Sequence, residues 1–331
     1  MPRYYASGRG GMTESNLSLI TLSFQSGPYI DRCLGSLLDQ EAHEVIHADN
    51  GSNDIDLDEL RSDYPAVHQV RNGANLGFAA GMNRAAAVAT GDWLAFINPD
   101  AFADPDWLNE MRIAVESHPD TAIFTSLQID ARNAQRLDGA GDSLTFFGFP
   151  YRAGFGRPLL KDSHAREVFS PCGAAFAIRR SLFLELEGFD RRFFCYCEDA
   201  DLGFRARLMG ENCRLVPEAM VAHVGSASTA KRSNFALYHG YRNRLWLYAK
   251  NMPLMLLIPT LPFHIGMTLL VVVVDILKGN GRIVWKGLHD GVMGMGPILV
   301  RRKKIQSGRR ISALRLAKVL TWNPWKIVRR Q

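Results

Sequence analysis

Residues 17–24 read LSLITLSF, a compact apolar run with β-branched residues that Gly27 and Pro28 follow closely. A short apolar run bounded by turn residues predicts a buried β-strand. Over residues 29–38 the apolar positions change to helical spacing, which predicts a helix directly after the strand. The chain therefore opens with a strand followed by a helix.

The same unit recurs along the next hundred residues or so. Strands are predicted at residues 44–48, 67–71 and 93–97, and helices near 57–62 and at 78–89. Four alternations of this kind predict an α/β fold with a doubly wound, mostly parallel sheet. A strand at 170–178, a helix at 202–209 and short strands at 215–216 and 220–224 complete the expected domain, while the Gly-rich residues 130–170 are expected to form a loop region over the active face.

Polar clusters follow three of the predicted strands. They are Asp49-Asn50-Gly51-Ser52, residues 72–77 with Asn75 and Gly77, and Asn98-Pro99-Asp100. Ligands bind such sheets outside the carboxyl ends of the strands, so these clusters predict one shared site. No G-x-G-x-x-G motif follows the first strand, which disfavours a dinucleotide-dependent oxidoreductase.

The C-terminal third has a different composition. Residues 251–274 contain no Asp, Glu, Lys or Arg, and residues 278–331 hold 14 Lys or Arg against the single acid Asp290. An apolar segment of this length followed by basic residues predicts association with the cytoplasmic face of a membrane. Three prolines in its first half make a bent or interfacial hairpin at least as good an expectation as a straight span, and a buried core helix pair is the other alternative. Nucleic acid is a less favoured partner for the basic tail.

These features divide the chain into a flexible arm at 1–14, an α/β domain at 15–250 and a membrane-associating region at 251–331. The five cysteines are odd in number and lack C-x-x-C spacing, which argues against a disulfide framework or a zinc site. A reducing, cytoplasmic location is consistent with this count.

The motifs together resemble those of family 2 glycosyltransferases with the GT-A fold, close to the rhamnosyltransferase-like branch. The resemblance covers about residues 17–250 and rests on the order of its motifs, which are the three strand-end clusters, Gly173-Ala174-Ala175, Gly188-Phe189-Asp190 and Glu198-Asp199-Ala200-Asp201-Leu202. It implies an inverting enzyme that moves one sugar from a nucleotide-diphosphate sugar, with dTDP-rhamnose and UDP-sugars as candidate donors. The expected acceptor is a hydroxyl of a polyprenyl-linked or cell-envelope glycan. No Q-x-x-R-W motif is present, which favours addition of a single sugar over processive synthesis.

The reaction requires a base for the acceptor hydroxyl and positive charge near the departing diphosphate. By the resemblance, Asp199 is the catalytic base, and Asp100 and His223 bind Mg²⁺ or Mn²⁺. Asn98 replaces a carboxylate of the usual metal motif, which predicts weaker metal binding. The residues expected to bind the donor are Asp49, Asn50, Gly51, Ser52, Asn75, Gly77, Asn98 and Arg242.

Each of these residues has a structural alternative. Asp49 and Asp100 could cap turns, and the acids at 198–201 could complement a helix dipole. His223 could be an ordinary buried histidine, and Arg242 could lie on a solvated helix face.

The competing functions are a sugar nucleotidyltransferase, disfavoured because residues 23–27 lack a basic residue, and a non-catalytic membrane scaffold of the same fold. The sugar, the base, the acceptor and the oligomeric state stay open.

Overall fold

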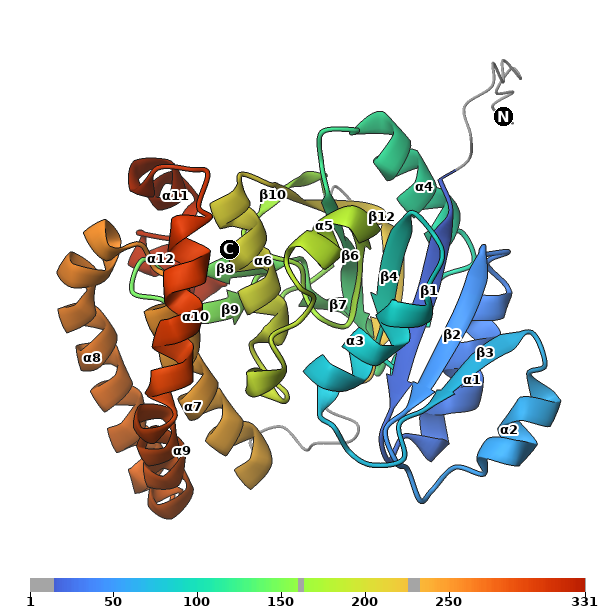
Figure 1. Ribbon diagram of the computed structural model, residues 1–331, viewed down its shortest axis with the longest axis horizontal. Coiled ribbons are helices and arrows are strands. Elements are labelled where there is room, and N and C mark those ends of the chain that lie inside the picture. The colour runs from blue at the N-terminus through green and yellow to red at the C-terminus, as the bar shows by residue number, and fades with distance from the viewer. Residues whose placement is uncertain (1–14, 160–163, 226–232, 331) are drawn as a thin grey trace.

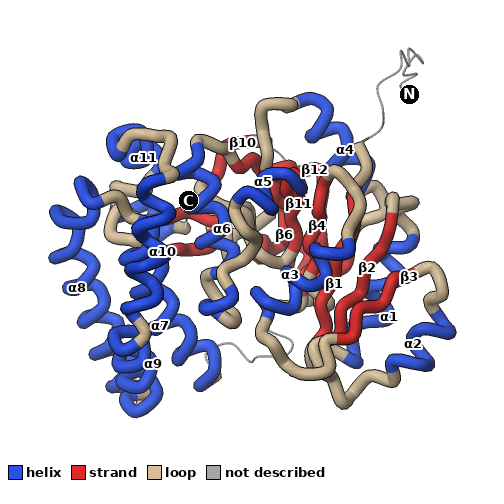
Figure 2. Tube along the Cα trace, in the orientation of Figure 1, coloured by secondary structure: helices blue, strands red, loops and turns tan. Residues whose placement is uncertain are grey.

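The computed structural model describes residues 15–159, 164–225 and 233–330. The predicted arm at 1–14 therefore lies outside the described residues. Figures 1 and 2 show one twisted sheet with helices on its two faces and a group of helices at one end of the molecule. The strands run in the order β10-β12-β6-β11-β4-β1-β2-β3, and β5 and β7 pair with β12 and β6 respectively.

The first half of the sheet is parallel, as predicted. Strands β1 and β2 pair in parallel, as do β2 with β3 and β1 with β4. The two faces of β1 are both buried: Ile20 and Leu22 pack with α3, and Leu17 and Leu19 pack with α1. This explains the continuous apolar run that begins the domain. The elements are β1 (Leu17–Ser23), α1 (Gly27–Leu38), β2 (Glu44–Asp49), α2 (Leu57–Asp63), β3 (Val67–Arg71), α3 (Phe78–Val88) and β4 (Trp93–Ile97).

The second half of the sheet is mixed. Strand β11 runs antiparallel between β4 and β6, and β12 runs parallel to β6. Two predictions need correction here: the pair of short strands at 215–224 is one strand, β12, whose pairing shifts between Val216 and Met220, and the strand at 170–178 begins only at Ala175. The elements are β5 (Ala101–Ala103), α4 (Trp107–Ser117), β6 (Ile123–Asp130), β11 (Ala175–Arg179), α5 (Arg180–Glu185), η1 (Arg191–Phe193), α6 (Glu198–Met209) and β12 (Cys213–His223).

Residues 130–170 contain more regular structure than the sequence suggested. They form β7 (Asn133–Gly139), β8 (Asp142–Leu144), β9 (Pro150–Arg152) and β10 (Arg166–Val168), with β8 and β9 paired as a separate two-stranded sheet. Short strands among glycines have too few periodic positions to be recognised from one sequence. Their expected place over the active face is confirmed below.

The C-terminal helices gather at the end of the molecule away from β3 and α2 (Figure 1). Residues 254–277 form one continuous helix, α8, with Pro259 and Pro262 inside it, so the hairpin alternative is not what the structure shows. Only 17% of its most apolar window is buried, which also disagrees with a core helix pair. The helices are α7 (Asn234–Asn251), α8 (Leu254–Leu277), α9 (Gly281–Met293), α10 (Met295–Ser307), α11 (Ala313–Val319) and α12 (Pro324–Arg329).

Candidate active site

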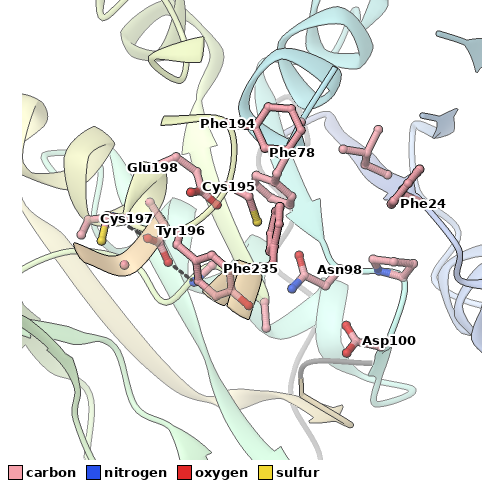
Figure 3. A pocket seen from close by; sticks show the side chains of 18 of the residues that line it. Phe24, Phe78, Asn98, Asp100, Phe194, Cys195, Tyr196, Cys197, Glu198 and Phe235 are labelled. Atoms are coloured by element: carbon pink, nitrogen blue, oxygen red, sulfur yellow. Dashed lines mark hydrogen bonds between the residues drawn. The ribbon is translucent and has the colours of Figure 1, made fainter. Parts of the chain in front are cut away.

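A cavity of about 690 Å³ opens at the carboxyl ends of β1 and β4. Figure 3 shows Asn98 and Asp100 on one side of it, and Tyr196, Cys197 and Glu198 on the other. Seven predicted site residues line this cavity, namely Asn50, Asn75, Gly77, Asn98, Asp100, Asp199 and His223. The predicted meeting of polar groups at one sheet edge is therefore observed. Asp49, Gly51, Ser52 and Arg242 are not among the lining residues.

The turn after β2 shows why Asp49 is set back from the cavity. Its carboxylate accepts hydrogen bonds from the Gly51 amide at 2.9 Å, the Ser52 amide at 3.2 Å and the Ser23 hydroxyl at 3.1 Å. These bonds hold the turn, so the capping alternative describes the geometry of Asp49. A contact of Asp49, Gly51 or Ser52 with a nucleotide stays a prediction.

The same turn presents Asn50 to the cavity. The Asn50 amide nitrogen donates to the carbonyl of Gly77 and to Asn75 Oδ1, each at 3.2 Å, which ties the turn to the segment before α3. Gly77 has φ of +80°, and a Cβ there would lie 2.5 Å from the ring of Phe194. The close approach of this loop to Phe194 therefore requires glycine.

Asp100 and His223 lie together because Ala101 pairs with His223 in the antiparallel β5–β12 ladder. His223 Nε2 is 3.4 Å from Asp100 Oδ1, and His223 Nδ1 is 2.7 Å from Asp138 Oδ2. If Nδ1 donates to Asp138, the lone pair of Nε2 points toward Asp100. An imidazole oriented by a carboxylate on its other nitrogen is the usual arrangement of a metal-binding histidine.

This pair fits a hard divalent cation. Carboxylate oxygen and imidazole nitrogen are suitable ligands, and Mg²⁺ commonly takes only one or two protein groups together with substrate phosphates. The described residues contain no group of three or more His, Cys, Asp or Glu side chains placed to hold a metal. Asn98 adds a neutral ligand candidate, because its Oδ1 is buried without a hydrogen-bond partner in the described part of the chain.

The opposite wall carries Asp199 at the start of α6. Its carboxylate accepts from the Gly173 amide at 2.9 Å and from the Ala200 amide at 2.7 Å. Burial raises the pKa of Asp199 above its ordinary value, although these two bonds oppose the shift. The pKa of the neighbouring Asp142 is raised to about 8, first by burial and then by the charge of Asp199. Asp142 is therefore protonated at neutral pH, while the Gly173 and Ala200 amides favour the ionised form of Asp199.

Sequence reasoning missed Asp142 and Arg152, which also line the cavity. Arg152 forms an ion pair with Asp138 and interacts electrostatically with Asp142 and Asp199. The available signal was the pair of acids around small residues in Asp138-Gly139-Ala140-Gly141-Asp142, within the region expected over the active face.

Comparison with known proteins decides the family. The model described as Glycosyl transferase family 2 matches residues 18–186, slightly more than half of the chain. The chain belongs to glycosyltransferase family 2. It is 29% identical over 250 residues to the N-acetylglucosaminyl-diphospho-decaprenol L-rhamnosyltransferase of Mycobacterium tuberculosis, a match covering 67% of this chain and 81% of that protein. The resemblance drawn from the motifs is thereby confirmed.

Two solved glycosyltransferase structures share the fold. The mannosyltransferase PcManGT from Pyrobaculum calidifontis, in complex with GDP-Man and Mn²⁺, has a TM-score of 0.54 and 16% identity, over 96% of this chain and 84% of its own. GalNAc-T7 with UDP, GalNAc and Mn²⁺ has a TM-score of 0.54 and 18% identity, over 63% of this chain. This chain spans 43% of the length of GalNAc-T7. At these identities the likeness establishes the GT-A fold.

Arg242 of this family 2 glycosyltransferase supports a loop of the site. Its Nη2 donates to the carbonyl of Phe193 at 2.8 Å, and its Nε donates to Asn243 Oδ1 at 2.9 Å. The guanidinium also lies 4.5 Å from the centroid of the Trp246 ring. Arg242 is half-buried and does not line the cavity, so donor binding by Arg242 stays a prediction.

Asn243 supports the same loop from α7. Its buried side-chain nitrogen lies 2.9, 2.8 and 2.7 Å from the carbonyl oxygens of Phe193, Cys195 and Tyr196 respectively. Phe194, Tyr196 and Cys197 all have positive φ although none is glycine, so the loop adopts a conformation that costs about 1 kcal/mol or more per residue. The loop leads directly into Asp199, which makes Asn243 a positioning residue for it.

Replacing Asn243 with alanine should release this loop. The three carbonyls would lose a shared donor, and we expect a loss of about 1–3 kcal/mol in the free energy of unfolding, measured in urea. We also expect kcat to fall, because the loop leads directly into Asp199, and the KM for the donor to change less, because the loop reaches the segment before α3 through Phe194. An unchanged kcat in a folded Asn243→Ala variant would contradict the positioning role.

Proposed function

We propose that this glycosyltransferase transfers a single sugar, with inversion, from a nucleotide-diphosphate sugar to a hydroxyl of a polyprenyl-diphosphate-linked glycan. The observation that carries the proposal is one cavity with Asp100 and His223 on one wall and Asp199 on the other. The acceptor class is supported by the mycobacterial relative, whose name describes rhamnosyl transfer to a diphospho-decaprenol-linked sugar. A dTDP-rhamnose or UDP-sugar donor is the corresponding candidate.

Asp199 is proposed as the base. As the acceptor oxygen forms its bond to the anomeric carbon, its proton passes to the Asp199 carboxylate, and the bond from the anomeric carbon to the diphosphate oxygen breaks. Attack from the side opposite the leaving group inverts the configuration. A carboxylate with a raised pKa is a stronger base than an ordinary aspartate, and the Gly173 and Ala200 amides hold it in place.

Mg²⁺ or Mn²⁺ is the proposed cofactor, held by Asp100 and His223. When bound, such an ion offsets the negative charge that develops on the departing diphosphate. Asp138 keeps the His223 ring oriented, and Asn50, Asn75 and Asn98 place amide groups around the donor. The support for a metal is the 3.4 Å approach of Asp100 and His223, together with the Mn²⁺ named in two structures of this fold.

A transfer assay tests the proposal directly. The full chain would be incubated with a polyprenyl-diphosphate N-acetylglucosamine acceptor, Mn²⁺ or Mg²⁺, and a panel of nucleotide-diphosphate sugars. We expect one donor to give a singly glycosylated product whose new linkage has the anomeric configuration opposite to the donor's. A product of retained configuration, or none with any donor in the panel, would contradict the proposal.

The cytoplasmic face of a plasma membrane is the proposed location, and α8 is the proposed contact. The polarity of this helix is the reverse of that expected for a helix on a water-exposed surface. Its outward side chains are almost all apolar, while most of its buried positions are polar; these are Leu256, Thr260, His264, Thr268 and Asp275. The outward set includes Leu254, Met255, Ile258, Phe263, Leu269, Leu270, Val273, Ile276 and Leu277. A soluble surface rarely exposes an apolar patch of this kind.

Contacts along the helix favour a position on the membrane over one across it. Tyr248 Oη is 2.8 Å from Thr260 Oγ1, His264 Nδ1 is 2.8 Å from the Phe147 carbonyl, and Tyr241 donates to Asp275 at 2.8 Å. These contacts attach α8 to the catalytic domain over most of its length, which leaves one side for lipid. Exposed Trp285, Trp322 and Trp325 and the basic residues around α9 suit the headgroup region.

Charged residues on the outward side of α8 should prevent membrane binding. We expect the variant Leu269→Asp/Leu270→Asp to lose flotation with vesicles of phosphatidylethanolamine and phosphatidylglycerol, because burying two carboxylates in lipid is unfavourable. Leu184→Asp, on exposed α5, is the matched control and should float like the wild-type chain. Equal flotation of all three proteins would contradict the contact proposed for α8.

A further inference from the structure

Arg244 is a half-buried cation that the proposed reaction does not use. Its guanidinium lies between two aromatic rings, 4.0 Å from the centroid of Phe149 and 4.8 Å from that of Tyr241. Its Nε and Nη2 are buried and have no hydrogen-bond partner among the residues that the structure describes. A buried guanidinium without acceptors is unfavourable, so the arrangement is suited to an anion that supplies them.

In the described part of the chain, neighbouring groups do not supply the hydrogen-bond acceptors that Nε and Nη2 of Arg244 lack. The charge of Asp275 acts on Arg244, but Asp275 Oδ2 accepts from Tyr241, and no ion pair to Arg244 occurs in the described ranges. Arg242, two residues earlier, differs in this respect because its N–H groups donate to Phe193 and Asn243. Lys250, on the same helix, is bonded to Asp190 and Asp201.

The place of Arg244 identifies the anion. On one side, Arg244 lies against the ring of Phe149, and the next residues along the chain, Pro150 and Tyr151, line the catalytic cavity. On the other side lies α8, whose His264 has its ring 5.4 Å from that of Phe149. Arg244 thus lies between the cavity and the helix proposed to contact lipid.

We propose that Arg244 binds the diphosphate of the lipid-linked acceptor. A polyprenyl-diphosphate sugar must place its sugar at Asp199 and its chain in the membrane, so its diphosphate must lie between the two. The planar guanidinium presents two adjacent N–H groups, Nε and Nη2, in the geometry that suits two phosphate oxygens. This inference rests on the proposed function and adds the subsite that selects a diphosphate-linked acceptor.

The test compares acceptors that do and do not carry the diphosphate. With the full chain, kcat/KM is measured for a polyprenyl-diphosphate sugar and for an alkyl glycoside of the same sugar. We expect Arg244→Met to lower kcat/KM about 100-fold for the diphosphate acceptor, and far less for the glycoside. Arg244→Lys should be intermediate, and Arg61→Met, exposed on α2, should match the wild-type chain. Equal losses for both acceptors, or none for the diphosphate acceptor, would overturn the inference.

Binding measurements separate this inference from the proposed function and from the donor's own diphosphate. Calorimetry with farnesyl diphosphate should show binding to the wild-type chain and at least tenfold weaker binding to Arg244→Met. UDP or dTDP should bind both proteins alike. Equal binding of farnesyl diphosphate to both would refute the inference, as would loss of nucleotide binding in the variant, which would assign Arg244 to the donor. A wild-type chain that binds farnesyl diphosphate through Arg244 but transfers no sugar would contradict the proposed function alone.

Discussion

Replacing Asp199 with asparagine should lower the rate of sugar transfer about 10³-fold, because the variant has no group placed to accept the acceptor's proton. Folding should be retained. The raised pKa of Asp199 means that the ionised carboxylate is less stable in the folded chain than in the unfolded one, so removing its charge does not remove a stabilising interaction. We expect thermal melting within about 3 °C of wild type, measured by circular dichroism.

Two comparisons make the Asp199 result specific. Asp63→Asn, on the exposed end of α2, controls for the loss of one carboxylate. The variant Asp142→Asn tests which of the two acids is the base. Asp142 is already protonated at neutral pH, so replacing its carboxyl group should lower the rate of transfer less than tenfold. If Asp142→Asn is the more damaging change, the roles of the two acids are reversed.

The pH dependence has a defined sign. Protonation of Asp199 removes the base, and its pKa lies above the ordinary aspartate value, so kcat/KM should fall on acidification at a higher pH than an ordinary aspartate would give. An acidic limb below pH 4 would disagree with a buried base.

Replacing Lys250 with methionine should produce the largest loss of stability. Lys250 Nζ is fully buried and lies 2.7 Å from both Asp190 Oδ2 and Asp201 Oδ1, which joins α7 to the segment before η1 and to α6. Without the ammonium group the two buried carboxylates keep one charged partner each, Arg192 for Asp190 and Arg205 for Asp201, and Asp201 keeps the neutral donor Asn251. We expect the free energy of unfolding to fall by about 3–5 kcal/mol in urea titrations at neutral pH.

The loss of stability in Lys250→Met should depend on pH. Burial favours the neutral form of Asp190, but the charges and hydrogen bonds of Lys250 and Arg192 together outweigh it and hold the pKa of Asp190 at about 2. The stabilisation by this pair is present above the unfolded pKa of aspartate and disappears as the pH falls toward 2. The difference between Lys250→Met and wild type should therefore shrink in acid. Lys278→Met, exposed at the end of α8, should change stability little at any pH, and an equal effect of the two changes would contradict the account of the buried pair.

The sequence predicted the first half of the fold well because its signal is local. Runs of buried residues in β1, β2 and β4, with helical patterns after β1, β2 and β3, leave few other arrangements. The cavity followed from the same logic, since strand-end residues such as Asn50, Asn98 and Asp100 must lie on one edge of the sheet. Asp199 and His223 required the family resemblance, because their sequence neighbourhoods alone do not separate them from a helix start and a core histidine.

What the sequence could not give depends on distant contacts. Asp142 acquires its high pKa from burial and from Asp199, which is 57 residues away, and neither effect has a local pattern. Arg242 and Arg244 have the same residue type two positions apart, yet one donates to loop carbonyls and the other has unpaired N–H groups. Only the packing of α7 against its neighbours separates them. The continuous α8 likewise depends on tertiary contacts that keep a helix with two internal prolines intact.

The central claim is that the two walls of one cavity have different functions. Asp100 and His223 on one wall bind the donor and the metal, and Asp199 on the other accepts the proton of the acceptor hydroxyl. Calorimetric titration of the matched nucleotide-diphosphate sugar, with and without Mn²⁺, tests it most directly. The account predicts that Asp199→Asn binds the donor as tightly as wild type, while Asp100→Asn loses at least tenfold of the Mn²⁺-dependent affinity. Donor affinity that is unaffected by Asp100→Asn but abolished by Asp199→Asn would contradict it.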